Sequence, residues 1–147
     1  MEIDEVSAEI VNAAIRLHKR LGPGLLESVY EVVLAGVLIR AGLKVERQRA
    51  IDIEFDGLHF PGAFRADLVV QDCLVVEIKS VETLQPVHGK QLLTYLRLLQ
   101  QPVGLLLNFG GATMKEGIRR VVNDYRPSNP SAPPRLRVKH EKGEQDV

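Results

Sequence analysis

The chain of 147 residues is long enough for one domain with a hydrophobic core and little more. Its 19 lysines and arginines balance 19 aspartates and glutamates, so no bulk charge favours nucleic acid, and any such partner must be held by a local basic patch. The single cysteine, Cys73, excludes an intrachain disulfide and fits a reducing cytoplasm. The acidic start MEIDEV does not indicate a signal peptide, and the longest apolar run, Val32–Ile39, is too short to span a membrane.

Two helices are predicted first. Apolar residues at helical spacing predict a helix over Ile3–Leu21, which Gly22-Pro23-Gly24 ends. Pro23 suits the first position of a second helix, predicted from about Leu25 to Arg40, with Gly42 as its C-terminal signal. This second helix is apolar around most of its surface, which predicts that it is well buried.

Strands are predicted next. Partial alternation of apolar residues predicts a strand over Leu43–Phe55, with Asp56-Gly57 as its turn. Leu58–Phe60 begins the return of the chain. Phe64–Val70 and Leu74–Lys79 then predict two further short strands joined by a tight turn.

The remaining elements complete an α/β pattern. Pro86–Gln100 predicts a helix with leucines on one stripe, and Pro102 ends it. The apolar run Val103–Phe109 predicts a buried, central strand. Met114–Asn123 is ambiguous, and we favour a last edge strand because Gly117 weakens a helix. The order α-α-β-β-β-α-β(-β) predicts a mixed β-sheet flanked by helices.

The C-terminal segment differs in composition from the rest. Residues 126–147 hold four of the eight prolines, with serine, lysine and glutamate and few large apolar residues. Such a segment cannot bury enough apolar surface to offset the loss of chain entropy on folding. We therefore predict one domain over residues 1–125 and a disordered tail over 126–147.

Charged residues interrupt the two apolar strands around the tight turn. Asp67 lies on the first, and Glu77 and Lys79 lie on the second, although ionised groups resist burial unless they are paired or bound to metal. A two-residue turn at Gln71-Asp72 would place the two acids on opposite faces, whereas a three-residue turn, Gln71–Cys73, or a bulge places them on the same face.

The apolar pattern decides between these turns, because a slip of one residue moves every side chain to the other face. Only the register with an odd turn directs both apolar sets of the strands into the core, and it brings Asp67, Glu77 and Lys79 together. Two carboxylates and a lysine there could hold a divalent cation beside a water molecule, as in metal-assisted phosphodiester hydrolysis. The alternative is a cross-strand charged cluster on a solvated face. The apolar sets are Phe64, Ala66, Leu68 and Val70 on the first strand and Leu74, Val76 and Ile78 on the second.

Four short motifs follow one another along the chain: G-x-x-E-x-x-Y at Gly24–Tyr30, R-x-D at Arg65–Asp67, E-x-K at Glu77–Lys79 and Q-x-x-x-Y at Gln91–Tyr95. In this order and spacing the chain resembles the GxxExxY family, in the RecB-like branch of the PD-(D/E)XK nuclease superfamily. The resemblance extends from about Ile3 to Asn123. Ala66 replaces the proline of the superfamily's name, a departure that is common in divergent members.

The resemblance implies a restriction-endonuclease-like core with Mg²⁺ or Mn²⁺ between Asp67 and Glu77, and with the backbone carbonyl of Ile78 as a further ligand. Glu27 takes the place of an additional ligand or neighbour of the metal. Lys79 would orient or activate the attacking water and stabilise charge on the phosphate.

Other residues around the motifs have both supporting and purely structural interpretations. The i,i+4 spacing of Gln91 and Tyr95 places both on one helix face, where they contact substrate, buttress Lys79 or form a local surface pair. The helix dipole stabilises the negative charge of Glu27 near the start of its helix, so this position alone could explain the residue. Three further residues have structural roles as alternatives to substrate binding. Tyr30 would be part of the core, Arg65 would pair with Asp67, and His88 would be a structural histidine rather than a phosphate contact.

The first functional hypothesis is a Mg²⁺- or Mn²⁺-dependent nuclease acting on DNA or RNA, with DNA preferred and no membrane partner. The second is a catalytically silent nucleic-acid-binding or protein-interaction module on the same fold. A purely structural protein ranks last, because it leaves Asp67, Glu77 and Lys79 unexplained. A domain of this size often relies on a homodimer or another partner to enclose its substrate.

Overall fold

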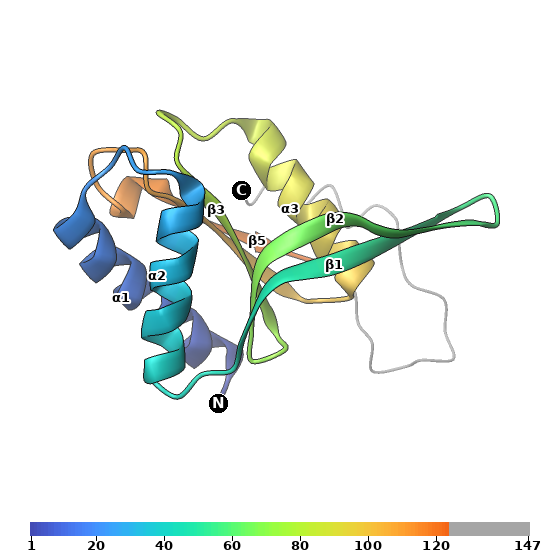
Figure 1. The fold of residues 1–147 in the computed structure, drawn as a ribbon, viewed down its shortest axis with the longest axis horizontal. Coiled ribbons are helices and arrows are strands. Elements are labelled where there is room, and N and C mark those ends of the chain that lie inside the picture. The colour runs from blue at the N-terminus through green and yellow to red at the C-terminus, as the bar shows by residue number, and fades with distance from the viewer. Residues whose placement is uncertain (124–147) are drawn as a thin grey trace.

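The computed structural model describes residues 1–123, so the predicted tail and the predicted domain end at residue 125 lie outside the described residues. A five-stranded sheet in the order β1-β2-β3-β4-β5 forms the centre of the molecule (Figure 1). The fold is an α/β domain with a mixed sheet flanked by helices, as predicted. Its elements are α1 (Ile3–Leu21), α2 (Glu27–Arg40), β1 (Val45–Phe55), β2 (Leu58–Val70), β3 (Leu74–Lys79), α3 (Pro86–Leu99), β4 (Val103–Asn108), the 3₁₀ helix η1 (Lys115–Gly117) and β5 (Ile118–Val122).

The sheet carries a hydrophobic core on each face. β3 and β4 are parallel and are joined by the α3 crossover, whereas the other neighbouring strands are antiparallel. Because side chains alternate along a strand, Val76 of β3 packs with α1 and α2 while its neighbour Val75 packs with α3. All six residues of β4 are buried, which confirms the predicted central strand.

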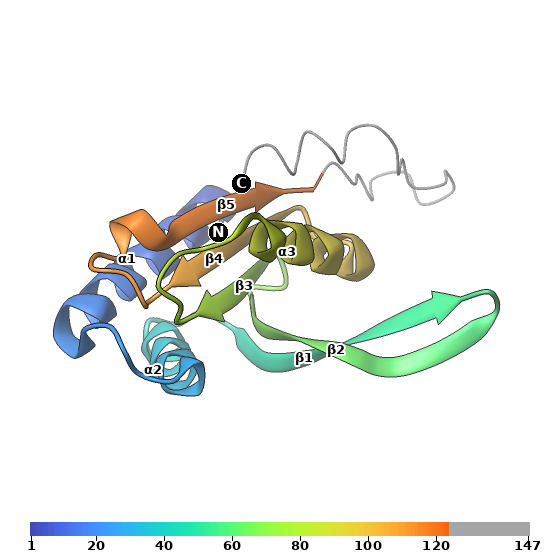
Figure 2. The same cartoon turned by 90° about the horizontal axis from the view of Figure 1, so that it is seen from above.

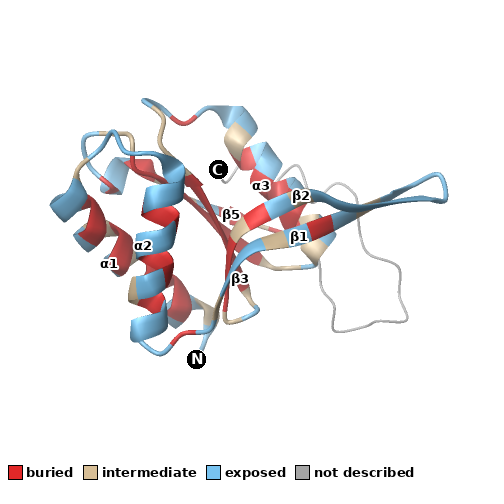
Figure 3. Ribbon diagram, viewed as in Figure 1, coloured by how far each residue is buried: buried red, intermediate tan, exposed pale blue. Residues whose placement is uncertain are grey.

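The second helix differs from its prediction in two respects. It begins at Glu27 rather than near Leu25, and Pro23 lies before it in the connecting loop instead of at its first position. It is also only half buried, because Val32 and Ile39 face solvent with exposed fractions of 51% and 54%. Figure 3 shows both buried and exposed residues along α2. The apolar residues of the helix therefore pack into the core on one side and are exposed to solvent on the other.

The first hairpin is longer and more twisted than predicted. β2 is one strand rather than two, and the outer part of the hairpin, residues 52–63, projects from the body as an arm (Figures 1 and 2). Phe64 and Ala66 pack with α3, while Leu68 and Val70 pack with α1 and α2, so the predicted single apolar face is wrong. Gln48, whose φ is 54°, lies opposite this change of face, where the hairpin twists.

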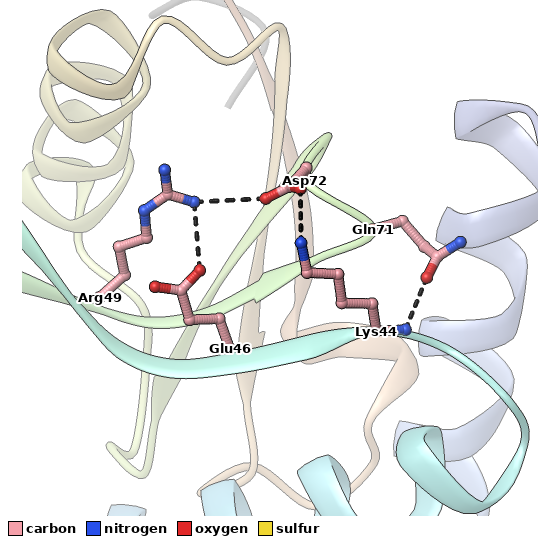
Figure 4. Close-up of polar contacts among 5 residues, drawn as sticks. All are labelled: Lys44, Glu46, Arg49, Gln71 and Asp72. Atoms are coloured by element: carbon pink, nitrogen blue, oxygen red, sulfur yellow. Dashed lines mark hydrogen bonds and ion pairs between the residues drawn. The ribbon is translucent and has the colours of Figure 1, made fainter.

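A polar cluster fixes the turn between β2 and β3 (Figure 4). The backbone N–H of Lys44 donates to Gln71 Oε1 over 2.6 Å, and the N–H of Gln71 donates back to the Lys44 carbonyl over 2.8 Å. Asp72 accepts from the Lys44 ammonium over 2.8 Å and from Arg49 over 3.5 Å. These contacts hold the turn against the start of β1, and its three residues match the register of β2 with β3.

Candidate active site

The two strand carboxylates lie side by side at the α3 face of the sheet. The pairs Val70–Leu74, Val69–Val75 and Leu68–Val76 leave a three-residue turn, Gln71–Cys73, so Asp67 comes opposite Glu77 as predicted. Glu77 Oε1 accepts from the Asp67 N–H over 3.4 Å, and Asp67 Oδ2 accepts from the Ile78 N–H over 2.8 Å. Each acid is therefore held by the backbone of the other's strand.

Glu77 is almost withdrawn from water, with 6% of its surface exposed. Burial, and then the neighbouring Asp67 carboxylate, raise the pKa of Glu77 to about 9, against a smaller opposing effect of Lys79. An ionised Glu77 therefore needs a positive charge beside it. A divalent cation supplies such a charge, and in this sense the carboxylate pair fits a metal.

Glu27 joins the site from the start of α2. Its Oε2 accepts from the backbone N–H of Ser80 over 3.1 Å, directly after the last residue of β3, Lys79. Ser80 also donates from its hydroxyl to the Leu25 carbonyl over 2.7 Å. The helix start is thus tied to the end of β3 that carries Lys79, although Glu27 is 53 residues from Ser80 in the chain.

Tyr30 is fully buried and supports the loop that carries Glu27. Its hydroxyl donates to the Gly22 carbonyl over 2.6 Å and accepts from the Leu25 N–H over 3.1 Å. Its ring stacks on Phe109 with centroids 4.4 Å apart. The glutamate and tyrosine of the G-x-x-E-x-x-Y motif therefore act together: the tyrosine shapes the loop, and the loop places the glutamate.

Helix α3 covers the other side of the carboxylates. Tyr95, 7% exposed, packs against Phe64, and burial followed by the charges of Glu77 and Asp67 raises its pKa. Gln91 lies one turn earlier and is exposed, and its side chain makes no hydrogen bond among the described residues. The two therefore flank the site differently, Tyr95 as part of its wall and Gln91 toward solvent.

His88 and Arg65 lie near the site with backbone partners. His88 Nδ1 accepts from the Gln85 N–H over 3.0 Å, a bond that caps the start of α3. Burial and then the nearby Lys79 lower the pKa of His88, with Glu27 opposing. Arg65 donates to the Gln48 carbonyl over 3.1 Å, and no ion pair joins it to Asp67 in residues 1–123.

Sequence reasoning missed a second polar connection to Asp67. Gln48 Nε2 donates to Asp67 Oδ1 over 3.3 Å and to Glu31 Oε1 over 2.7 Å. Glu31, 5% exposed, also pairs with Arg47 over 3.1 Å. The available signal was the i,i+4 spacing of Glu31 from Glu27, which places both acids on one face of α2.

The donor set of this site suits a hard cation that keeps part of its water shell. Among residues 1–123, no three side chains of histidine, cysteine, aspartate or glutamate gather closely enough to hold a metal ion by themselves. Magnesium sites commonly use one or two carboxylates, with water and substrate phosphate completing the octahedron. Asp67 and Glu77 match that pattern. In the same range, no helix has the length and apolar character needed to cross a membrane.

A family model described as the PD-(D/E)XK nuclease superfamily matches residues 4–121, a range that includes every site residue described above. No curated protein and no solved structure matches the chain.

Proposed function

The chain belongs to the PD-(D/E)XK nuclease superfamily, and from this premise we propose that it is a metal-dependent nuclease that hydrolyses phosphodiester bonds, with DNA as the preferred substrate and RNA as the alternative. The observation that carries the proposal is the contact of Asp67 with Glu77 on neighbouring strands, at distances of 3.4 and 2.8 Å between each carboxylate and the opposite backbone. Glu27 and Lys79 lie at the adjoining strand end.

In the proposed reaction, Asp67, Glu77 and the carbonyl of Ile78 would hold Mg²⁺ or Mn²⁺, with Glu27 as a further ligand or neighbour. The bound cation would lower the pKa of its water and neutralise charge on the phosphate. Lys79 orients the attacking water and stabilises negative charge as it develops. Tyr95 excludes water from the inner side of the carboxylates, and exposed Gln91 contacts the substrate.

We further assign the chain to the GxxExxY family and the RecB-like branch. The support is the arrangement of the motif residues: Glu27 is tied to the end of β3, and Tyr95 faces the carboxylates from α3. Tyr30 supports this assignment because it shapes the loop before Glu27.

The test is cleavage of labelled single-stranded DNA, duplex DNA and RNA with Mg²⁺, Mn²⁺ or EDTA. Lys79→Ala should lower the cleavage rate by about 10²–10³-fold, the usual loss for one charge-stabilising group. Lys115→Ala is the matched control, since this lysine is exposed on η1 and has no part in the proposed site. Circular dichroism checks that both variants are folded.

Cleavage that persists in EDTA, or that is equal in wild type and Lys79→Ala, would contradict the proposal. Calorimetry with Mn²⁺ distinguishes the nuclease from the catalytically silent binding module. Binding of nucleic acid without binding of Mn²⁺ would identify a silent binding module instead.

A further inference from the structure

The arm formed by residues 52–63 presents an apolar face to solvent. Phe55 pairs with Leu58 and Ile53 pairs with Phe60, so the alternation of each strand places all four side chains on one face of the ribbon. Phe55, Leu58 and Phe60 are exposed by 67%, 58% and 46%. Figure 3 shows the arm exposed along its length. An isolated two-stranded ribbon is only marginally stable in water, so a partner surface would stabilise it.

The charge of the arm limits the kind of partner. It carries Asp52, Glu54 and Asp56, and residues 52–63 contain neither lysine nor arginine. A β-ribbon of this charge is repelled by the phosphate backbone of nucleic acid, which binds through lysine and arginine. Asp56 lies at the turn, whereas Asp52 and Glu54 lie on the other face of the ribbon, each 3.8 Å from His59. The arm therefore suits a surface that is apolar where it meets the four apolar side chains and basic around them, within the range over which charges are not fully screened.

The same chain has such a surface between α1 and α2. A groove of about 520 Å³ has an apolar floor that includes Leu17 and Val37. Four cations line it, and no acid does; they are Arg16, Lys19, Arg20 and Arg40. The groove is built from residues other than those of the candidate active site, and the exposed apolar face of α2 continues beside it.

We propose that the arm of one copy of this chain docks in the α1–α2 groove of a second copy. The arm and the two helices lie at opposite ends of the molecule (Figures 1 and 2). An arm therefore cannot reach the groove of its own copy. A two-fold dimer forms the contact twice, because each copy then supplies one arm and one groove, and such closed symmetry leaves neither surface free. The proposal does not rest on nuclease activity.

The test is sedimentation velocity of the full chain over a range of concentrations. Wild type should form a dimer that weakens as salt is added, since the docked charges are opposite. Phe55→Ser and, separately, the double variant Arg16→Glu/Arg20→Glu should each raise the dissociation constant by about 30-fold or more, as loss of a central anchor does. Val87→Ser is the matched control, because Val87 is 62% exposed on α3 and should leave the dimer unchanged.

Mixing Phe55→Ser, which alters the arm, with Arg16→Glu/Arg20→Glu, which alters the groove, locates the contact. The mixture contains one intact arm and one intact groove per pair, so it should associate more tightly than either variant alone and more weakly than wild type. A photo-crosslinking residue at position 60 should label the α1–α2 segment of the other copy. A chain that stays monomeric at all concentrations would overturn the proposal, as would a dimer that is unaffected by both variants.

Discussion

At the scale of single residues, the site combines two carboxylates that differ in environment. Glu77 is buried beside Asp67, and this raises its pKa to about 9, whereas Glu27 is exposed and accepts from a backbone N–H at the strand end. A buried acid of this kind is stable when it carries a proton or lies beside a cation, and it is strained when it carries neither. The cation that we propose for this site would therefore compete with the proton for the same carboxyl group.

This competition predicts how stability varies with pH. In the metal-free protein, Glu77 keeps its proton to about pH 9, whereas in the unfolded chain it loses it near the usual value of 4.5. The contribution of Glu77 to the free energy of unfolding is therefore complete below pH 4.5 and is lost as the pH rises through about 9. Melting temperatures in EDTA from pH 5 to 9 should fall for wild type more steeply than for Glu77→Gln.

The control is Glu82→Gln, which changes an exposed acid outside the site and should retain the wild-type slope. Mn²⁺ should flatten the fall in wild type, because the cation stabilises the ionised carboxylate. Parallel slopes for wild type and Glu77→Gln would show that this carboxyl does not hold its proton in the folded protein.

At the scale of elements, two glycines give opposite expectations. Gly36 lies exposed inside α2 with nothing near the position of an added Cβ, so Gly36→Ala should raise the free energy of unfolding by up to about 1 kcal/mol. At Gly110, which follows β4, a Cβ would meet the backbone carbonyl of Val81, so Gly110→Ala should lower it by about 1–3 kcal/mol. Urea unfolding measures both, and a shift of the same sign in the two variants would contradict this packing.

Periodicity with clear breakers was sufficient for several elements. α1 and β3 begin and end where they were predicted, and the turn at Gln71–Cys73 has the predicted length. The start of α2 was predicted wrongly because the buried Tyr30 hydroxyl holds Gly22 and Leu25 in a loop. A side chain that bonds backbone five and eight residues away leaves no periodic signal in the sequence.

The candidate site also has features that the sequence predicted and features that it did not. Asp67 lies opposite Glu77 as predicted because the turn has the predicted odd length, although the apolar set of β2 that was used to choose this register is divided between the two faces of the sheet. The bridge from Glu31 through Gln48 to Asp67 was not predicted, because it joins α2 to β1 through a twist at Gln48. The faces of Phe64 and Ala66 were missed for the same reason.

At the scale of the whole molecule, the protein has a buried body and an exposed arm (Figure 3). Amide exchange should be slow in β3 and β4, whose residues are all buried except the half-buried Lys79, and fast in residues 52–63 when the protein is dilute. The docking proposed above should slow exchange in the arm and along α1 and α2 as concentration rises. Exchange in the arm that is independent of concentration would count against a self-associating arm.

The three-residue turn between β2 and β3 also has a kinetic consequence. Asp67 and Glu77 are 10 residues apart in the chain, and loops of that length close in about 10–100 ns, so this hairpin forms among the early events of folding. The contact of Glu27 with Ser80 joins residues that are 53 apart in the chain, and the parallel pairing of β3 with β4 requires the α3 crossover. Both contacts should form later, because they close longer loops. We therefore expect the two carboxylates to meet while water still surrounds them, before the helices pack against the sheet and bury Glu77.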